Sequence, residues 1–184
     1  MIVSHLHLNH REAFLRMLED YEAHDPENGK FYARGRADFP AYVQSLADDE
    51  QGIHLRPEWV PCSHRWLLDD SGAILGIVHI RHNIDTPFIA EELGHIGYDV
   101  PPSARGHGYG IACLQAGLEE ARRLCLARVL LCADTINPAS WRTIEHCGGV
   151  LEIERYSAHY QTLVRRYWIE TGPVAFNRPS KGSA

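Results

Sequence analysis

A glycine-rich segment, RGHGYG at residues 105–110, constrains the fold of this 184-residue chain more than any other feature. It follows an apolar, strand-like run over 93–100 and precedes an amphipathic helix predicted over 111–124. A glycine-rich turn that opens a helix points unpaired backbone N–H groups, and the positive end of the helix dipole, at one place. Glycine also lets the backbone approach an anion closely and adopt positive φ. The segment therefore predicts an anion-binding loop, most often a loop for phosphate.

The identity of the phosphate ligand follows from the spacing of the motif. A Walker A loop requires a Gly-Lys-[Ser/Thr] ending, and this segment contains no lysine. A Rossmann fingerprint reads G-x-G-x-x-G, whereas Gly106, Gly108 and Gly110 give G-x-G-x-G. Five residues, Pro101 to Arg105, also separate the strand from the first glycine, where the Rossmann turn is tight. Asp134, at the end of the next predicted strand, is the one feature that favours a dinucleotide, which stays an alternative.

The R-x-x-G-x-G pattern between a strand and a helix resembles the acyl-CoA pyrophosphate loop of the GNAT superfamily of N-acetyltransferases. Downstream, the chain shows a strand over 127–133, the segment Asn137-Pro138-Ala139-Ser140, a short helix and the pair Gly148-Gly149. This order is similar to the N-x-x-[AS] helix start and the glycine pair of that superfamily. The resemblance is specific over 94–152 and looser elsewhere, and the chain looks like an uncharacterised bacterial branch.

The resemblance and the periodicity together predict an α+β fold, with a mixed, mostly antiparallel central sheet flanked by helices. Strands are expected over 2–8, 65–68, 73–80, 93–100, 127–133, 150–153 and 163–169, and helices after a capping box of Asn9 and Glu12, over 39–48, over 111–124 and from 138. We expect a single domain over 1–171 and a mobile tail over 172–184.

By resemblance, the protein is an N-acetyltransferase that takes an acetyl group from acetyl-CoA and passes it to a primary amine, of a small molecule or a peptide, by direct attack. The backbone N–H of Val100 would stabilise the oxyanion. Asn137 would contact the cofactor, but it could equally be a plain helix N-cap. The residues expected to bind the cofactor are Tyr98, Val100, Arg105, Gly106, His107, Gly108, Tyr109, Gly110, Asn137 and Ser140.

The sequence offers several candidate groups for proton transfer. Many members of the superfamily carry a tyrosine as general acid where this chain has Glu145, so the usual acid is missing or replaced. Glu91, Glu92 and His95 are the candidates for the general base. Alternation along a strand would place Glu91 and His95 on one side and Glu92 on the other, and each could equally be structural.

Other polar residues have two possible roles each, in function or in structure. Arg81 and His82, directly after a predicted strand, could line the acceptor pocket or only anchor the following connection. The spacings His5-x-His7 and His79-x-x-His82 could suit a metal, but no cysteines or carboxylates cluster with them, so we expect no metal. A non-catalytic acyl-CoA-binding module remains an alternative function.

Charge and cysteine content narrow the environment. The formal net charge of −6 and the lack of a dense Lys/Arg run argue against nucleic acid and anionic membranes as partners. Five cysteines without a regular pattern are typical of buried thiols in a reducing cytosol. No signal peptide or transmembrane-length segment is visible. We therefore expect a cytoplasmic protein, and by resemblance a homodimer.

Overall fold

Two antiparallel sheets organise the computed structural model, which describes residues 1–172. The first sheet has four strands in the order of the chain: β1 (Ile2–Ser4), β2 (Cys62–Leu68), β3 (Ile74–Arg81) and β4 (Ile96–Asp99). The second has three strands in the order β5-β7-β6: β5 (Arg128–Asp134), β7 (Thr162–Glu170) and β6 (Val150–Ser157). The predicted α+β class is confirmed. The predicted tail lies outside the described residues, apart from Gly172.

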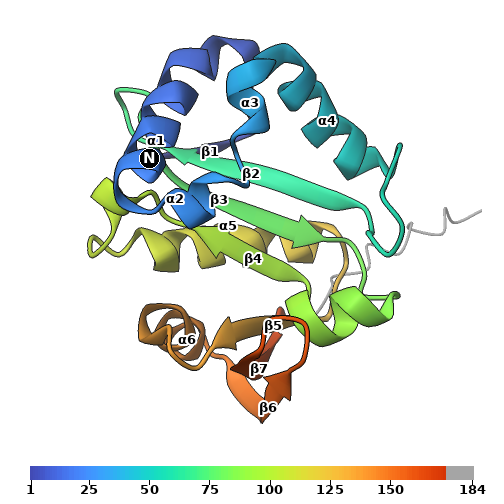
Figure 1. Cartoon of the computed structure of the whole chain (residues 1–184). Helices are drawn as coiled ribbons and strands as arrows, with labels where there is room; N and C mark the ends of the chain where they lie inside the picture. Colours follow the sequence, from blue (N-terminus) through green and yellow to red (C-terminus); the bar gives the residue numbers. More distant parts are fainter. Residues whose placement is uncertain (173–184) are drawn as a thin grey trace, which may run out of the picture.

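Helices cover both faces of the first sheet (Figure 1). The face shown at the top carries α1 (Arg11–His24), α2 (Pro26–Gly29), α3 (Arg34–Ala37) and α4 (Phe39–Gln51). The long helix α5 (Tyr109–Arg123) packs against β3 and β4 on the opposite face. Helix α6 (Pro138–His146) packs against β5 and α5. Three short turns complete the chain: η1 (Leu8–His10), the π-helical η2 (Ile89–Leu93) and η3 (Pro102–Ala104).

The two cores lie on opposite faces of β2 and β3. Trp66 on β2 and Ile77 on β3 pack under α1 and α4, whereas Leu67 and Val78 pack with α5 and the second sheet. Successive side chains of a strand point to opposite faces, so a strand buried on both faces must be apolar almost throughout. This burial explains why the sequence predicted β3 and the second part of β2, whereas Cys62 to His64, at the more polar start of β2, were not predicted.

Local signals fixed some helix ends but not others. The Asp38 carboxylate accepts a hydrogen bond from the Ala41 N–H at 3.0 Å and caps α4, which begins at Phe39 as predicted. The predicted capping box of Asn9 and Glu12 is wrong, because α1 begins at Arg11 behind the 3₁₀ turn η1. The first strand is also shorter than predicted and ends at Ser4.

The divergence of β4 from β5 is the feature that shapes the functional region. The two strands meet only at a bridge between Gly94 and Leu131, next to a 2.7 Å hydrogen bond from the His95 N–H to the Leu130 carbonyl. Gly94 has a φ of 69°, and a Cβ there would collide with the Leu130 carbonyl, so the position requires glycine. Beyond Gly94 each strand pairs only with its own sheet.

Candidate active site

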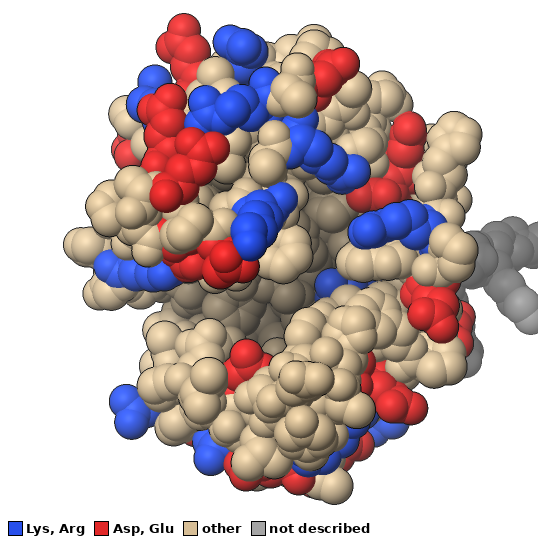
Figure 2. Space-filling model, in the orientation of Figure 1, with Lys and Arg blue, Asp and Glu red and all other residues tan. Residues whose placement is uncertain are grey.

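A cavity of about 490 Å³ opens where β4 and β5 separate. Figure 2 shows the corresponding hollow between the half of the molecule that carries α1–α4 and the half that carries α6 and the second sheet. The cavity wall combines β4, the glycine-rich loop, the starts of α5 and α6, and the α1–α2 junction. Its lining residues are Asp25, Asn28, Tyr98, Asp99, Val100, Ala104, Arg105, Gly106, Gly108, Tyr109, Gly110, Ile111, Asn137, Ala139, Ser140 and Thr143.

The glycine-rich loop presents backbone to this cavity. Gly106 and Gly108 have φ values of 80° and 83°, and Gly108 is the N-cap of α5. A Cβ on either glycine would meet no atom within 4 Å, so the space beside the loop is open on the cavity side. The first N–H groups of α5 lack partners within the helix and point toward this space. The loop can therefore bind an anion through its backbone and through the helix dipole.

The Arg105 side chain holds the loop to the N-terminal segment. Its Nε donates to the Val100 carbonyl at 3.0 Å, and its Nη2 pairs with the Asp25 carboxylate at the α1–α2 junction. This hydrogen bond lowers the pKa of Asp25. The structure thus places Arg105 at the cavity, but with its guanidinium already engaged, so an anion would meet mainly the loop backbone. His107 turns its imidazole to the Arg105 carbonyl, 2.8 Å away, and does not line the cavity.

Hydroxyl and amide groups form the wall between β4 and α6. The Tyr98 hydroxyl donates to the Ser140 carbonyl at 3.1 Å and lies 3.3 Å from Ser140 Oγ. Burial raises the pKa of Tyr98, so this hydroxyl keeps its proton. The Asn137 side chain accepts a hydrogen bond from the Ser140 N–H at 3.1 Å, as the predicted N-cap of α6 does. Thr143, which the sequence did not single out, completes the wall.

The backbone of β4 faces the cavity with alternate residues. The Arg81 N–H donates to the His95 carbonyl at 2.7 Å, and β3 and β4 then pair in register. Because facing groups alternate along an antiparallel pair, Gly97 and Asp99 direct their N–H and C=O groups at β3. Tyr98 directs both of its backbone groups at the opening between β4 and β5, and Val100 directs its N–H there, since the Val100 carbonyl already accepts from Arg105. An extended ligand can add as a strand at this opening.

Asp99 is the titratable residue of β4 in the cavity wall that sequence reasoning missed. Its carboxylate is partly buried and accepts a hydrogen bond from the Tyr32 hydroxyl at 2.7 Å. Burial is the main cause that raises the pKa of Asp99, opposed by this hydrogen bond. A polar residue in an apolar strand directly before an anion-binding loop was the available signal. Tyr32 could not be linked to it from sequence, since 67 residues separate the pair.

The predicted base candidates lie away from the cavity lining. Glu91 and Glu92 belong to the π-helical turn η2, so the expectation that Glu91 and His95 share one side of a strand is wrong. Glu91 is exposed, and the Glu92 carboxylate accepts from Ser157 Oγ at 2.6 Å. His95 is buried, its Nδ1 accepts from the Leu130 N–H at 3.0 Å, and burial lowers its pKa to about 4. These contacts give His95 a structural role, in which it links the start of β4 to β5.

Glu145, at the position of the missing tyrosine, also directs its side chain away from the cavity. Its carboxylate accepts a hydrogen bond from the buried Tyr167 hydroxyl on β7 at 2.9 Å. It does not line the cavity. Glu145 therefore links α6 to the second sheet.

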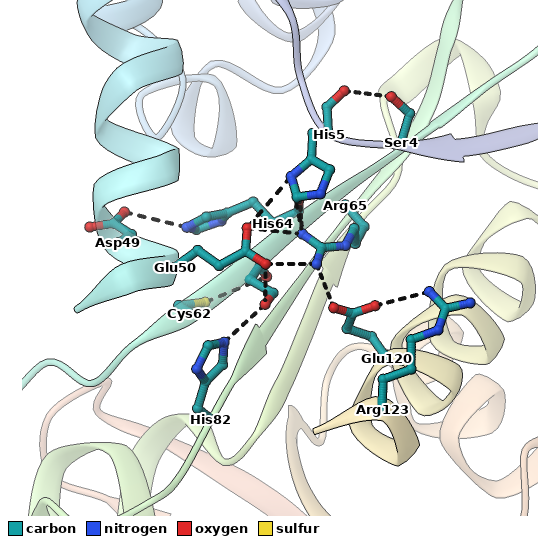
Figure 3. Close-up of polar contacts among 11 residues, drawn as sticks. Ser4, His5, Asp49, Glu50, Cys62, His64, Arg65, His82, Glu120 and Arg123 are labelled. Carbon is teal, nitrogen blue, oxygen red and sulfur yellow. Dashed lines mark hydrogen bonds and ion pairs between the residues drawn. The ribbon is translucent and has the colours of Figure 1, made fainter. Parts of the chain in front are cut away.

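A separate polar cluster joins α4, β2 and α5 (Figure 3). The buried Arg65 guanidinium pairs with Glu50 on one side and Glu120 on the other, and Ser63 Oγ donates to Glu50 at 2.9 Å. A second cavity, of about 680 Å³, lies beside this cluster between β1 and α5. Since Glu120 also pairs with Arg123 at 3.2 Å, two carboxylates and two arginines balance in charge, and the cluster links α4 to α5.

Residues 1–172 form neither a metal-binding cluster nor a membrane-spanning helix. No group of three or more His, Cys, Asp or Glu side chains there is arranged to hold a metal ion. No helix in the same range has the length and apolar character needed to cross a membrane.

Comparison with known proteins agrees with the geometry. The family model for the acetyltransferase (GNAT) family matches residues 15–148, which is more than half of the chain. No curated protein sequence matches at a significant level. Among solved structures, the microcin C7 self-immunity acetyltransferase MccE, in complex with acetyl-CoA and AMP, has a TM-score of 0.67 at 15% identity, with 91% of each chain covered.

Two other solved structures share the fold. RimL, a ribosomal L7/L12 alpha-N-protein acetyltransferase in complex with coenzyme A, has a TM-score of 0.66 at 16% identity over 91% of this chain and 92% of its own. A spermidine N-acetyltransferase, SpeG, from Vibrio cholerae has a TM-score of 0.56 at 14% identity over 93% and 95%.

The dinucleotide alternative is excluded by the topology, because a Rossmann fold requires a parallel sheet and every strand pair in the described chain is antiparallel. The family match covers the glycine-rich loop, the divergent strands and the start of α6. The chain therefore belongs to the acetyltransferase (GNAT) family and is an N-acetyltransferase that uses acetyl-CoA as its acetyl donor.

Proposed function

We propose that acetyl-CoA binds in the cavity between β4 and β5, with its pyrophosphate at the glycine-rich loop and its pantetheine arm along β4. The loop offers backbone N–H groups at the start of α5, with Gly106 and Gly108 open to the ligand. Tyr98 offers its N–H and C=O groups to an extended arm, and the Val100 N–H lies at the end of the same strand edge, toward the thioester. The observation that carries this proposal is the meeting of both features in one cavity.

We infer that Asp99 accepts the proton of the acceptor amine. The amine nitrogen attacks the thioester carbonyl carbon, its proton passes to the Asp99 carboxylate, and the C–S bond then breaks. The backbone N–H of Val100 stabilises the oxyanion, as the family resemblance implies. A partly buried carboxylate with a raised pKa is a stronger base than an exposed one, which supports Asp99 over the exposed Glu91 and the braced His95.

The leaving thiolate requires a proton donor other than Glu145. Tyr98 and Ser140 place two hydroxyl groups 3.3 Å apart on the cavity wall. The raised pKa of Tyr98 keeps that hydroxyl protonated at neutral pH. We assign this pair the protonation of the thiolate.

Direct attack is favoured over a covalent acetyl-cysteine route. A nucleophilic cysteine requires a thiolate, and burial raises the pKa of Cys113 to about 12 and that of Cys132 to about 11. Neither cysteine lines the cavity. The amine therefore has no thiolate relay to use there.

Calorimetric titration with acetyl-CoA tests the donor site. We expect wild type to bind and Gly108→Trp to lose binding, because the indole would fill the open space beside the loop. Gly72→Trp is the matched control, since Gly72 also has positive φ (82°) with nothing within 4 Å of a Cβ, but lies in the β2–β3 turn. Equal binding by both variants would contradict the assignment of the loop.

Asp99→Asn separates catalysis from binding. We expect it to bind acetyl-CoA like wild type and to release free thiol about 10²- to 10⁴-fold more slowly with an amine present. Wild type that binds acetyl-CoA but acetylates no member of an amine panel would instead support the non-catalytic module.

The environment and assembly also remain proposals. We infer a cytoplasmic location from five free cysteines, of which Cys125 is exposed. The acidic net charge continues to argue against nucleic acid and anionic membranes as partners. A homodimer is supported by exposed apolar side chains along the edge strand β6, at Val150, Leu151 and Ile153. Light scattering in solution tests the dimer.

A further inference from the structure

Two buried arginines on neighbouring strands differ in their partners. Arg65 on β2 is 8% exposed and pairs with two carboxylates (Figure 3). Arg81, the last residue of β3, is equally buried at 8% exposure. Within residues 1–172, Arg81 has no ion pair, and the titratable groups close enough to act on its charge are Cys62, Cys132, Tyr160, His79 and His95, none of them a carboxylate. A buried charge is strongly unfavourable unless it is paired, so Arg81 calls for an explanation that Arg65 does not.

The Arg81 guanidinium also has unused hydrogen-bonding capacity. Its Nη1 donates to the Gly94 carbonyl at 3.2 Å. Its Nε is buried and has no partner in the part of the chain that the structure describes. A guanidinium carries five N–H donors in a planar fork, which matches a carboxylate in a bidentate arrangement. An anion would supply both the charge and the acceptor that Arg81 lacks.

Open space adjoins this guanidinium on the face of β4 that carries Asp99. A Cβ placed on Gly97 would lie 3.9 Å from Arg81 Nη1 and would meet no other described atom within 4 Å. Gly97 and Asp99 are two residues apart on one strand, so they share a face and their Cα atoms lie about 6.6 Å apart. This face of β4, which we call the acceptor face, has the Asp99 carboxylate at one end and Arg81 at the other, with Gly97, which has no side chain, between them.

We propose that the acceptor of this enzyme is a compact amine that also carries a carboxylate, such as an amino acid, and that Arg81 binds this carboxylate. This inference rests on the proposed function, since Asp99 then takes the proton of the same molecule's amine. The acceptor lies over Gly97, with its two charged groups directed at the two ends of the face. Its nitrogen forms the new C–N bond, the C–S bond of acetyl-CoA breaks, and its carboxylate is unchanged.

Matched pairs of amines test this assignment. Each pair consists of an amino acid and the amine that its decarboxylation leaves: glycine and methylamine, β-alanine and ethylamine, 4-aminobutyrate and propylamine, phenylalanine and phenethylamine. We expect kcat/KM to favour the carboxylated member of at least one pair by about 10- to 100-fold, the range of a charge-assisted hydrogen bond. We expect Arg81→Met to bring that ratio close to one, and Arg81→Lys to retain part of it.

The controls separate binding from folding. Arg81→Met removes an uncompensated buried charge and keeps a side chain of similar length, so its melting temperature should equal or exceed that of wild type. Arg16→Met, on the exposed surface of α1, should keep the wild-type ratio. Wild-type preference for the uncarboxylated member of every pair, or a ratio that survives Arg81→Met, would overturn the proposal.

A measurement without turnover decides the matter if none of these amines is acetylated. N-acetylglycine carries the carboxylate of an acetylated amino acid, and N-methylacetamide lacks it. We expect millimolar N-acetylglycine, with or without coenzyme A, to raise the melting temperature of wild type but not of Arg81→Met. Equal effects of the two compounds on wild type would refute the role of Arg81, whereas loss of acetyl-CoA binding alone would refute the proposed donor site.

Discussion

The hydrogen bond between Tyr32 and Asp99 makes the proposed base testable through pH. The Tyr32 hydroxyl lies 2.7 Å from the Asp99 carboxylate and stabilises its ionised form, which lowers a pKa that burial raises. Tyr32→Phe removes only this hydroxyl from a side chain that is 2% exposed. The pKa of Asp99 must then rise further, and a base with a higher pKa loses its proton at higher pH. The acidic limb of kcat/KM should therefore move upward.

The size of this movement follows from the hydrogen bond. A hydrogen bond to a charged group contributes about 1.5–3 kcal/mol, and because Asp99 is only partly buried we take the lower end. One pH unit corresponds to about 1.4 kcal/mol, so the limb should rise by about one pH unit. The assay is the initial rate of thiol release, measured with a thiol-reactive dye from roughly pH 5 to pH 9, at acceptor concentrations below KM.

Tyr42→Phe is the control for this experiment. Tyr42 packs in the same buried cluster as Tyr32, at 5% exposure, but its hydroxyl makes no hydrogen bond to Asp99. The acidic limb of the kcat/KM profile of Tyr42→Phe should stay at the wild-type pH. A limb that does not move in Tyr32→Phe, or moves to lower pH, would show that Asp99 is not the titrating base.

Three other changes test the surrounding structure. Burial raises the folded-state pKa of Asp99, so ionisation of this carboxyl destabilises the fold as pH rises above about 4. Asp99→Asn should therefore melt at the same or a higher temperature than wild type at pH 7. A clearly lower melting temperature would contradict this reasoning. Gly94→Ala should lower the free energy of unfolding in urea by at least about 2 kcal/mol more than Gly72→Ala, since both have positive φ but only Gly94 faces a backbone carbonyl. Glu145→Gln should change kcat less than about twofold, because Glu145 bonds Tyr167 outside the cavity, and a tenfold loss would restore it as the general acid.

The sequence predicted the glycine-rich side of the cavity, because that side depends on local geometry. Gly106 and Gly108 are needed for a turn that opens α5, and Asn137 caps α6, so each signal lies within a few residues of the structure it determines. The buried strands β2 and β3 were predictable for the same reason, from apolar runs interrupted by a turn. These elements require no knowledge of distant contacts.

The proton-transfer groups could not be predicted in this way, because their environment comes from remote residues. The pattern did not show that His95 would be fixed by Leu130, or that Glu91 would lie on a π-helical turn. It also did not show that the Asp99 carboxylate would accept a hydrogen bond from the Tyr32 hydroxyl. Whether a polar residue in a strand is catalytic or structural depends on which partner the tertiary fold brings to it.

One N-terminal segment contacts the end of β4 once and the following β4–α5 connection twice. Asp20 on α1 accepts a hydrogen bond from the Ser103 N–H at 2.8 Å, Asp25 pairs with Arg105, and Tyr32 bonds Asp99.

These three contacts connect the anion-binding loop with the proposed acceptor face, because both are held by the segment that runs from the end of α1 to the start of α3. A change in this segment should therefore alter donor binding through Arg105 and proton transfer through Asp99 together. The segment carries few sequence signals of its own, yet it sets the environment in which the recognisable loop works. The acceptor side of the enzyme is thus determined mainly by the part of the chain that motif reading describes least.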